Sequence, residues 1–247
     1  MEINLFKSDY TYYIKNEMFC VADVAAGGKN LGSAEFVSGD QVCYNTLYME
    51  QARQRAARIK LILTDVDGIL TDGKVNFFLT PDGKIEEFKS FHTQDGIALM
   101  LCHSAGILCG IITGRRHPTT VERAKNLGFK YMYQGFLTKI GPLQDVLEKE
   151  NLTADQVCYI GDDITDIPLL AEVGFAATVP NAVEVVKDHA HYITKRVGGD
   201  GALREVVDFI LDAQGKLDPI LEQVKASAWT QSPRPKLEII TSQEGLN

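Results

Sequence analysis

The sequence predicts an α/β fold, in which a doubly wound parallel β-sheet is covered by helices. Between about residues 57 and 216, short apolar runs alternate with longer segments that favour helices, which is typical of parallel strands buried on both faces. Acidic and glycine-containing motifs follow the apolar runs directly, and in such sheets ligands bind beyond the carboxyl ends of the strands. With 247 residues, 45% of them hydrophobic, the chain is long enough for one substantial core.

We expect three parts: an N-terminal extension at residues 1–56, the α/β domain at 57–216, and a C-terminal tail at 217–247. The extension mixes aromatic residues with a glycine-rich patch at residues 25–30 and lacks a clear periodicity. Residues 49–60, where the extension meets the α/β domain, have the composition of a helix. The tail contains several prolines, so we expect it to be largely irregular.

Within the α/β domain the expected elements follow one another in alternation. Strands are predicted at residues 60–64, 107–113, 131–134, 157–160 and 175–179. Helices are predicted around residues 95–105, 117–127, 140–150, 166–173 and 201–212. An insertion at residues 73–91 has two extended runs around Pro81-Asp82-Gly83, which predicts a β-hairpin flap.

The overall charge limits the partners that the chain can take. The formal net charge is −8, which repels nucleic acid and anionic lipid headgroups, so we expect neither partner. A continuous run of about 18 apolar residues, as a membrane span requires, is not present in the sequence. Five widely spaced cysteines and a polar start at Met1 favour free thiols in a reducing cytoplasm.

The first motif with a chemical role is Asp65-Val66-Asp67-Gly68, directly after the first predicted strand. Two carboxylates at ~4 Å repel by about 4 kcal/mol at an effective dielectric constant near 20. A divalent cation relieves this repulsion, and oxygen ligands suit Mg²⁺. A solvated acidic turn and a calcium loop are alternatives, although the apolar Ile69 after Gly68 argues against the calcium loop.

Three further motifs lie at the ends of later strands. Gly161-Asp162-Asp163 offers Asp162 as a second metal ligand, with Asp166 behind it; the alternative is a cluster that caps a helix. Thr113 and Gly114 form a turn whose hydroxyl and N–H groups suit phosphate oxygens; the alternative is an ordinary turn. Lys139 precedes a helix, and a lone lysine is more often a solvated surface group.

The order of these motifs along the chain resembles that of the haloacid dehalogenase superfamily of phosphotransferases, which has a Rossmann-like core. The resemblance implies that Asp65 is the nucleophile that forms an aspartyl phosphate, and that Asp67 is the acid and base. It also implies that Thr113 and Lys139 hold the phosphoryl oxygens. Mg²⁺ would be bound by Asp65, Asp162 and the backbone carbonyl of Asp67.

Large cap domains in this superfamily are inserted at one of two points, and neither has room here. Hairpin, linker and helix fill the chain between Asp65 and Thr113, and one helix and one strand fill it between Lys139 and Asp162. We therefore expect no cap domain. An open site implies either a macromolecular substrate or a lid from a neighbouring subunit.

Finer features resemble one capless, tetrameric subgroup. These are the hairpin insertion, FHTQDG at 91–96, TGRR at 113–116, GGDGALRE at 198–205 and AQGKLD at 213–218. The resemblance implies a homotetramer that hydrolyses the small sugar-acid phosphate 3-deoxy-D-manno-octulosonate 8-phosphate, in lipopolysaccharide precursor synthesis. Nine-carbon ulosonic acid 9-phosphates are the alternative substrates, but relatives that use them tend to carry Glu where Arg115 stands.

The same resemblance implies a set of substrate-binding residues. They are His92, Thr93, Asp95, Gly114, Arg115 and Arg123. Arg115 and Arg123 would bind the sugar acid. For Arg123, the alternative role is a simple ion pair at the surface. His92 stands where relatives usually have Asn. Two non-enzymatic alternatives, a phosphoaspartate receiver and an idle interaction module, fit the intact Asp65 and Asp67 pair less well.

Overall fold

The computed structural model describes residues 5–8, 11–14, 39–230 and 232–243. The chain divides into two compact units, Met1–Tyr48 and Met49–Asn247, and each is described by itself. The first unit contains an antiparallel pair of strands, β1 (Leu5–Ser8) and β2 (Thr11–Ile14). Helix α1 (Gly39–Ala56) continues into the second unit. The glycine-rich patch at 25–30 lies outside the described residues.

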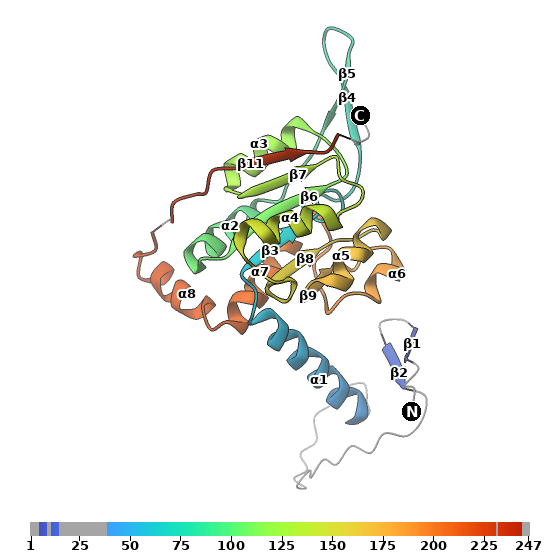
Figure 1. Cartoon of the computed structure of the whole chain (residues 1–247), viewed down its shortest axis with the longest axis vertical. Coiled ribbons are helices and arrows are strands. Elements are labelled where there is room, and N and C mark those ends of the chain that lie inside the picture. Colours follow the sequence, from blue (N-terminus) through green and yellow to red (C-terminus); the bar gives the residue numbers. More distant parts are fainter. Residues whose placement is uncertain (1–4, 9–10, 15–38, 231, 244–247) are drawn as a thin grey trace, which may run out of the picture. The chain divides into compact units, whose positions relative to one another are not determined.

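The second unit is built on a seven-stranded sheet in which every neighbouring pair is parallel (Figure 1). The strand order is β10-β9-β8-β3-β6-β7-β11. The strands are β3 (Leu61–Thr64), β6 (Leu108–Thr113), β7 (Tyr131–Gln134), β8 (Val157–Ile160), β9 (Phe175–Thr178), β10 (Tyr192–Ile193) and β11 (Glu238–Thr241). The predicted doubly wound parallel sheet is thus confirmed.

Helices cover both faces of this sheet, with α4 and α5 in front of it in Figure 1 and α7 behind. The helices are α2 (Thr93–Ala105), α3 (Pro118–Leu127), α4 (Ile140–Glu150), α5 (Ile167–Glu172), α6 (Glu184–Lys187), α7 (Ala202–Ala213) and α8 (Leu217–Lys225). Two short 3-10 turns, η1 (Ala154–Gln156) and η2 (Ile164–Asp166), precede β8 and α5. In the part of the chain that the structure describes, none of these helices has the length and hydropathy needed to span a membrane.

The core lies between the sheet and its helices. All four residues of β3, β8 and β9 are buried, as expected for strands that helices cover on both faces. Helix α7 buries one side, including Leu203, Val207 and Ile210, against α2 and the sheet. Burial of one apolar side chain of this size contributes about 1.5–3 kcal/mol, so the core fixes the strand ends that carry the polar motifs.

The hairpin flap consists of β4 (Asn76–Leu79) and β5 (Ile85–Phe88). The two strands are antiparallel, and Asn76 pairs with Phe88. Gly83 closes the connecting turn with a φ of +81°, a conformation that favours glycine. The flap is the insertion between β3 and α2, and α4 and η1 occupy the chain between β7 and β8. The predicted fold, with a flap and without a cap domain, is confirmed.

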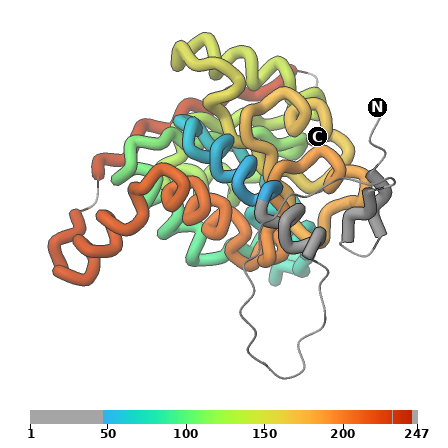
Figure 2. Tube along the Cα trace, turned by 90° about the horizontal axis from the view of Figure 1, so that it is seen from below, coloured from blue at the N-terminus to red at the C-terminus, as the bar shows by residue number. Residues whose placement is uncertain are grey.

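The C-terminal tail, expected to be largely irregular, contains one helix and one strand. Helix α8 lies at the periphery of the second unit in both views (Figures 1 and 2), and the chain then returns so that β11 adds a parallel edge strand beside β7. The prolines lie at the first turn of α8 and before β11, where they are compatible with regular structure. Helix α1 also differs from expectation, because it ends at Ala56 rather than Lys60.

Candidate active site

The central strands bring the predicted motifs to one edge of the sheet. Strand β3 lies between β8 and β6, so Asp65, directly after β3, lies between the ends that carry Asp162 and Thr113. The N–H of Asp65 donates to the carbonyl of Ile160 at 2.9 Å, which keeps the first loop in register with β8. Residues almost a hundred positions apart thus meet as the parallel topology predicts.

Asp65 is a buried carboxylate at this edge and faces a cation. It is 8% exposed, its Oδ1 accepts the N–H of Val66 at 2.7 Å, and its Oδ2 lies 3.1 Å from Nζ of Lys139. Burial raises the pKa of Asp65 to about 6, and the charge of Lys139 opposes that rise. The carboxylate is therefore held in place and is poorly solvated.

Lys139 lies just before α4 and is buried, in contrast to the usual solvated lysine. Its Nζ lies 2.5 Å from Oδ1 of Asp166 and 3.0 Å from the hydroxyl of Tyr159. Burial acts to lower the pKa of Lys139, but the charges of Asp65 and Asp166 outweigh it and raise the pKa. Lys139 is thus a fixed buried cation between two carboxylates.

Asp166 uses both oxygens to hold this arrangement together. Its Oδ1 accepts the Tyr159 hydroxyl at 2.6 Å in addition to Lys139. Its Oδ2 accepts the N–H groups of Asp162 and Asp163 at 2.9 and 3.1 Å. Asp166 therefore orients Lys139 and the loop that carries Asp162, and Tyr159 is a site residue that the sequence did not reveal.

Asp162 has the properties of a metal ligand. Oxygen atoms of Asp65, Asp162 and Asp166 all lie within 4.8 Å of one another, and Oδ1 of Asp162 is buried without a hydrogen-bond partner. Burial raises the pKa of Asp162 to about 8, with further contributions from Asp65 and Asp166. Hard oxygen donors with uncompensated charge fit a divalent cation such as Mg²⁺.

Gly68 makes room for this carboxylate. A Cβ at this position would lie 2.0 Å from Oδ2 of Asp162, and the φ of Gly68 is +92°. Both the close approach and the backbone conformation therefore require glycine. The close approach of Asp162 thus explains why the motif that begins at Asp65 has a glycine at position 68.

Asp67 forms an ion pair with a lysine. Its Oδ1 accepts a hydrogen bond from Nζ of Lys89, and the side chain of Lys89 is only 2% exposed. Lys89 follows the flap and lies 22 residues from Asp67 in the sequence. The sequence offered no local signal for this ion pair, which connects the flap to the expected acid and base.

Thr113 and Gly114 lie at the end of β6, as predicted. Thr113 is buried, and its Oγ1 accepts the N–H of Arg115 at 3.3 Å. A Cβ on Gly114 would lie 2.9 Å from the side chain of Leu137, so the turn packs closely against the loop that leads to Lys139. The turn and Lys139 are thus positioned together.

The expected substrate-binding residues are spread around this centre. Arg115 pairs with Glu87 of the flap at 2.6 Å. Arg123 donates to the backbone carbonyl of His92 at 2.9 Å, and Thr93 is exposed. Nδ1 of His92 accepts the N–H of Gln94 at 3.4 Å, so His92 begins α2.

Asp95 lies deeper than the other members of this set. It is 2% exposed, and its Oδ1 accepts the N–H of Arg204 at 3.1 Å, which caps the first turn of α7. Burial raises the pKa of Asp95 to about 6. Its observed contact is therefore with α7, while its Oδ2 lacks a hydrogen-bond partner.

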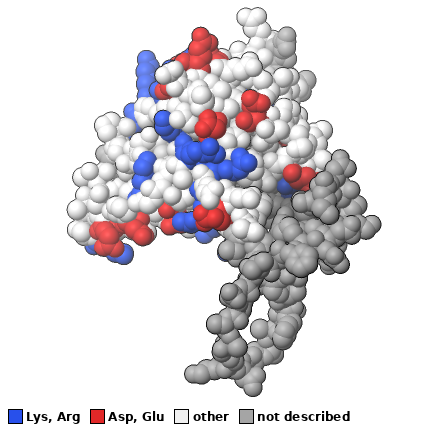
Figure 3. All heavy atoms as spheres, turned by 60° about the horizontal axis from the view of Figure 1, so that its bottom comes forward, with Lys and Arg blue, Asp and Glu red and all other residues white. Residues whose placement is uncertain are grey.

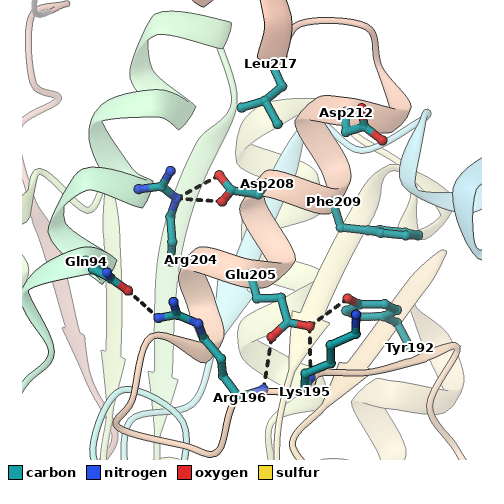
Figure 4. Close-up of a pocket in the computed structure, with 10 residues that line it drawn as sticks. All are labelled: Gln94, Tyr192, Lys195, Arg196, Arg204, Glu205, Asp208, Phe209, Asp212 and Leu217. Carbon is teal, nitrogen blue, oxygen red and sulfur yellow. Dashed lines mark hydrogen bonds and ion pairs between the residues drawn. The ribbon is translucent and has the colours of Figure 1, made fainter. Parts of the chain in front are cut away.

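A pocket of about 580 Å³ lies at the outer side of α7 (Figure 4). Its polar groups are largely engaged with one another: Arg204 pairs with Asp208 at 2.7 Å, and Glu205 accepts the Tyr192 hydroxyl at 2.9 Å. Figure 4 shows these pairs side by side along α7. None of the residues that form the Asp65 centre lines this pocket, so we assign the chemistry to the strand ends.

Comparison with known proteins identifies the family of the chain. A family model described as haloacid dehalogenase-like hydrolase matches residues 132–206. The 3-deoxy-D-manno-octulosonate 8-phosphate phosphatase of Yersinia pestis is 39% identical over 176 residues, which cover 71% of this chain and 91% of that protein.

Two solved structures show the same relationship. The phosphatase of that name from Moraxella catarrhalis, in complex with magnesium, phosphate and KDO, is 38% identical with a TM-score of 0.67, and the match covers 71% of this chain and 99% of that one. The cobalt-bound deoxy-D-mannose-octulosonate 8-phosphate phosphatase of Haemophilus influenzae is 35% identical with a TM-score of 0.65. This match covers 71% of this chain and 100% of that one.

The fold and these relatives define the chain as an enzyme, a phosphoric monoester hydrolase. The chain belongs to the haloacid dehalogenase-like hydrolases, in the branch formed by the 3-deoxy-D-manno-octulosonate 8-phosphate phosphatases. The resemblance seen in the order of the sequence motifs is thus confirmed.

Proposed function

We propose that the chain is a Mg²⁺-dependent phosphatase that converts 3-deoxy-D-manno-octulosonate 8-phosphate to the free sugar acid and phosphate, in lipopolysaccharide precursor synthesis. The observation that carries this proposal is the buried carboxylate of Asp65, which lies 3.1 Å from Lys139 and shares a cluster with Asp162. We assign catalysis to residues 57–216; residues 1–56 and 217–247 flank this domain.

In the proposed reaction, Asp65 attacks phosphorus and its oxygen forms the new bond, while the bond to the sugar oxygen breaks. Asp67 protonates the leaving alkoxide and then removes a proton from the water that hydrolyses the aspartyl phosphate. Lys139 and the turn at Thr113 bind the phosphoryl oxygens and stabilise their charge.

The metal would be held by Asp65, Asp162 and the backbone carbonyl of Asp67. When bound, Mg²⁺ neutralises the charge that builds up between these carboxylates and the phosphate. Asp166 holds the Asp162 loop through two N–H groups, and its own oxygens are fully engaged. We therefore assign Asp166 an orienting role rather than direct coordination.

The eight-carbon sugar acid is favoured by Arg115, because relatives that use nine-carbon acids tend to carry Glu at this position. The Arg115 side chain is 45% exposed while it pairs with Glu87 of the flap, so its guanidinium can bind a carboxylate through a second pair of N–H groups. His92, Thr93, Asp95, Gly114 and Arg123 surround the approach to this group in our assignment. Nine-carbon ulosonic acid 9-phosphates remain the second candidate.

We further propose that the chain assembles as a homotetramer through its flaps. Phe77, Leu79 and Ile85 are 63%, 71% and 73% exposed in the single chain, and exposed apolar clusters of this kind mark interaction surfaces. A neighbouring chain would cover these residues and close the site.

We expect no nucleic acid or membrane partner and a cytoplasmic location. The formal net charge of the chain is −8. On the face displayed in Figure 3, Lys and Arg side chains gather near the middle, and Asp and Glu side chains lie around them. Cys102, Cys109 and Cys158 are buried and free, as is usual in a reducing compartment.

Phosphate release from a panel of ulosonic acid phosphates tests the proposed function. The full chain should hydrolyse the eight-carbon 8-phosphate faster than nine-carbon 9-phosphates, and chelation of Mg²⁺ should stop the reaction. The Asp65→Asn variant should fold normally and release no phosphate. Preference for a nine-carbon substrate would favour the second candidate, and full activity of Asp65→Asn would refute the nucleophile.

A further inference from the structure

Glu87 occupies an unusual place in the flap. It lies on β5, whose neighbouring residues Glu86 and Phe88 are exposed, yet its own side chain is only 14% exposed. Because successive side chains of a strand point to opposite faces, Glu87 faces the body of the domain while Glu86 faces solvent.

Three basic side chains surround this one carboxylate. Arg115 lies 2.6 Å from its Oε2. Lys89 and His117 lie 3.9 and 3.8 Å from its Oε1, and this oxygen is buried without a hydrogen-bond partner. A half-satisfied buried carboxylate costs stability, so the arrangement is better explained by what Glu87 does to its cationic neighbours than by stability alone.

The same neighbours flank the acid and base. Lys89 contacts Asp67 directly. The hydrogen bond that Arg115 donates to Glu87 raises the pKa of Arg115. The nearby charge of Asp67 raises this pKa further, which indicates that the guanidinium lies within electrostatic reach of Asp67. Glu87 thus connects the flap to both basic groups at the mouth of the site.

A long arginine side chain loses considerable rotamer freedom when it binds a ligand. The short ion pair with Glu87 fixes Arg115 before any substrate arrives and leaves part of its guanidinium exposed. Without Glu87, this ordering would have to accompany substrate binding and would weaken it.

We propose that Glu87 is a positioning residue that orients Arg115 toward the carboxylate of the sugar-acid substrate. The inference rests on the proposed function, because Arg115 is assigned there to bind that carboxylate. Glu87 itself touches neither the phosphoryl group nor the reacting carboxylates in this account.

A double-mutant cycle with the full chain tests this role. Glu87→Ala should raise KM for 3-deoxy-D-manno-octulosonate 8-phosphate about tenfold, the effect of one lost charge-assisted hydrogen bond. It should change kcat by less than about twofold, because the interaction concerns binding alone. Glu87→Gln retains an acceptor oxygen and should raise KM by a smaller factor. In an Arg115→Ala background, Glu87→Ala and Glu87→Gln should leave KM close to that of Arg115→Ala alone, because the guanidinium that Glu87 orients is absent.

Glu86→Ala is the matched control, since it removes the same charge from the solvent side of the same strand, and it should leave KM and kcat unchanged. If Glu87→Ala does not fold, as a thermal melt would show, Glu87→Gln supplies the cycle. An unchanged or lower KM in the single variants, or an equal rise of KM with and without Arg115, would overturn the inference. Failure of the unmodified chain to hydrolyse the sugar-acid phosphate would instead refute the proposed function.

Discussion

Nζ of Lys139 lies 3.1 Å from Oδ2 of Asp65 and 2.5 Å from Oδ1 of Asp166. One buried cation therefore contacts two carboxylates. One of them is the expected nucleophile, and the other holds the loop that carries Asp162. This relationship couples the stability of the site to its chemistry.

We predict that Lys139→Met lowers both turnover and stability. Loss of the cation leaves two buried carboxylates uncompensated, which costs about 3–5 kcal/mol in the free energy of unfolding, and phosphate release should fall by at least about a hundredfold. Urea denaturation and steady-state kinetics measure the two effects. Lys149→Met, which removes partly exposed ion pairs with Asp145 and Glu238, should cost less than about 1 kcal/mol. Normal turnover in Lys139→Met would contradict the assignment.

Gly68→Ala should damage the metal site. The added Cβ would lie 2.0 Å from Oδ2 of Asp162 at a φ of +92°, so Asp162 has to move. We expect a higher Mg²⁺ concentration for half-maximal activity, together with lower kcat. Gly83→Ala is the control, because its φ is also positive but nothing lies within 4 Å of the added Cβ; it should cost only about 1–2 kcal/mol of backbone strain. Equal effects of both variants on Mg²⁺ dependence would exclude the steric explanation.

Much of this site follows from the sequence. Asp65 follows β3 directly, Thr113 is the last residue of β6, and Asp162 comes shortly after β8, and the ends of parallel strands meet at one edge. The orienting contacts did not follow. Lys89 and Tyr159 lie outside the motifs, and no spacing rule reveals which motif residue each of them contacts. Strand β11 was missed because a four-residue strand near prolines has no distinctive pattern of its own.

The fold should depend measurably on that missed strand. Ile240 packs against the core, whereas its neighbour Ile239 is 41% exposed on the other face of β11. We predict that Ile240→Ser lowers the free energy of unfolding by about 1–2 kcal/mol, and that Ile239→Ser has little effect. Denaturant titrations of both variants provide the measurement, and similar values for the two would show that β11 does not pack as described.

His191 should make the domain sensitive to mild acid. Its Nδ1 accepts the N–H of Ala176 at 2.9 Å, and burial lowers the pKa of His191 from 6.5 to about 4, with Arg55 contributing. The unfolded chain therefore binds the proton more readily than the folded one, so this contribution to stability is complete above pH 6.5 and is lost as the pH falls toward 4. His191→Gln should flatten the pH dependence of unfolding in this window. The same substitution at the exposed His189 should not, and an unchanged slope in His191→Gln would contradict the prediction.

The central claim is that Asp65, Lys139 and Asp162 act on one cation and one phosphoryl group. A crystal structure with Mn²⁺ and orthovanadate, with Mn²⁺ located by its anomalous scattering, tests this most directly. We predict Mn²⁺ between the carboxylates of Asp65 and Asp162, and vanadium at an oxygen of Asp65 with its own oxygens bound by Lys139 and Thr113. Mn²⁺ or vanadate bound at a place that does not include Asp65 would contradict the account.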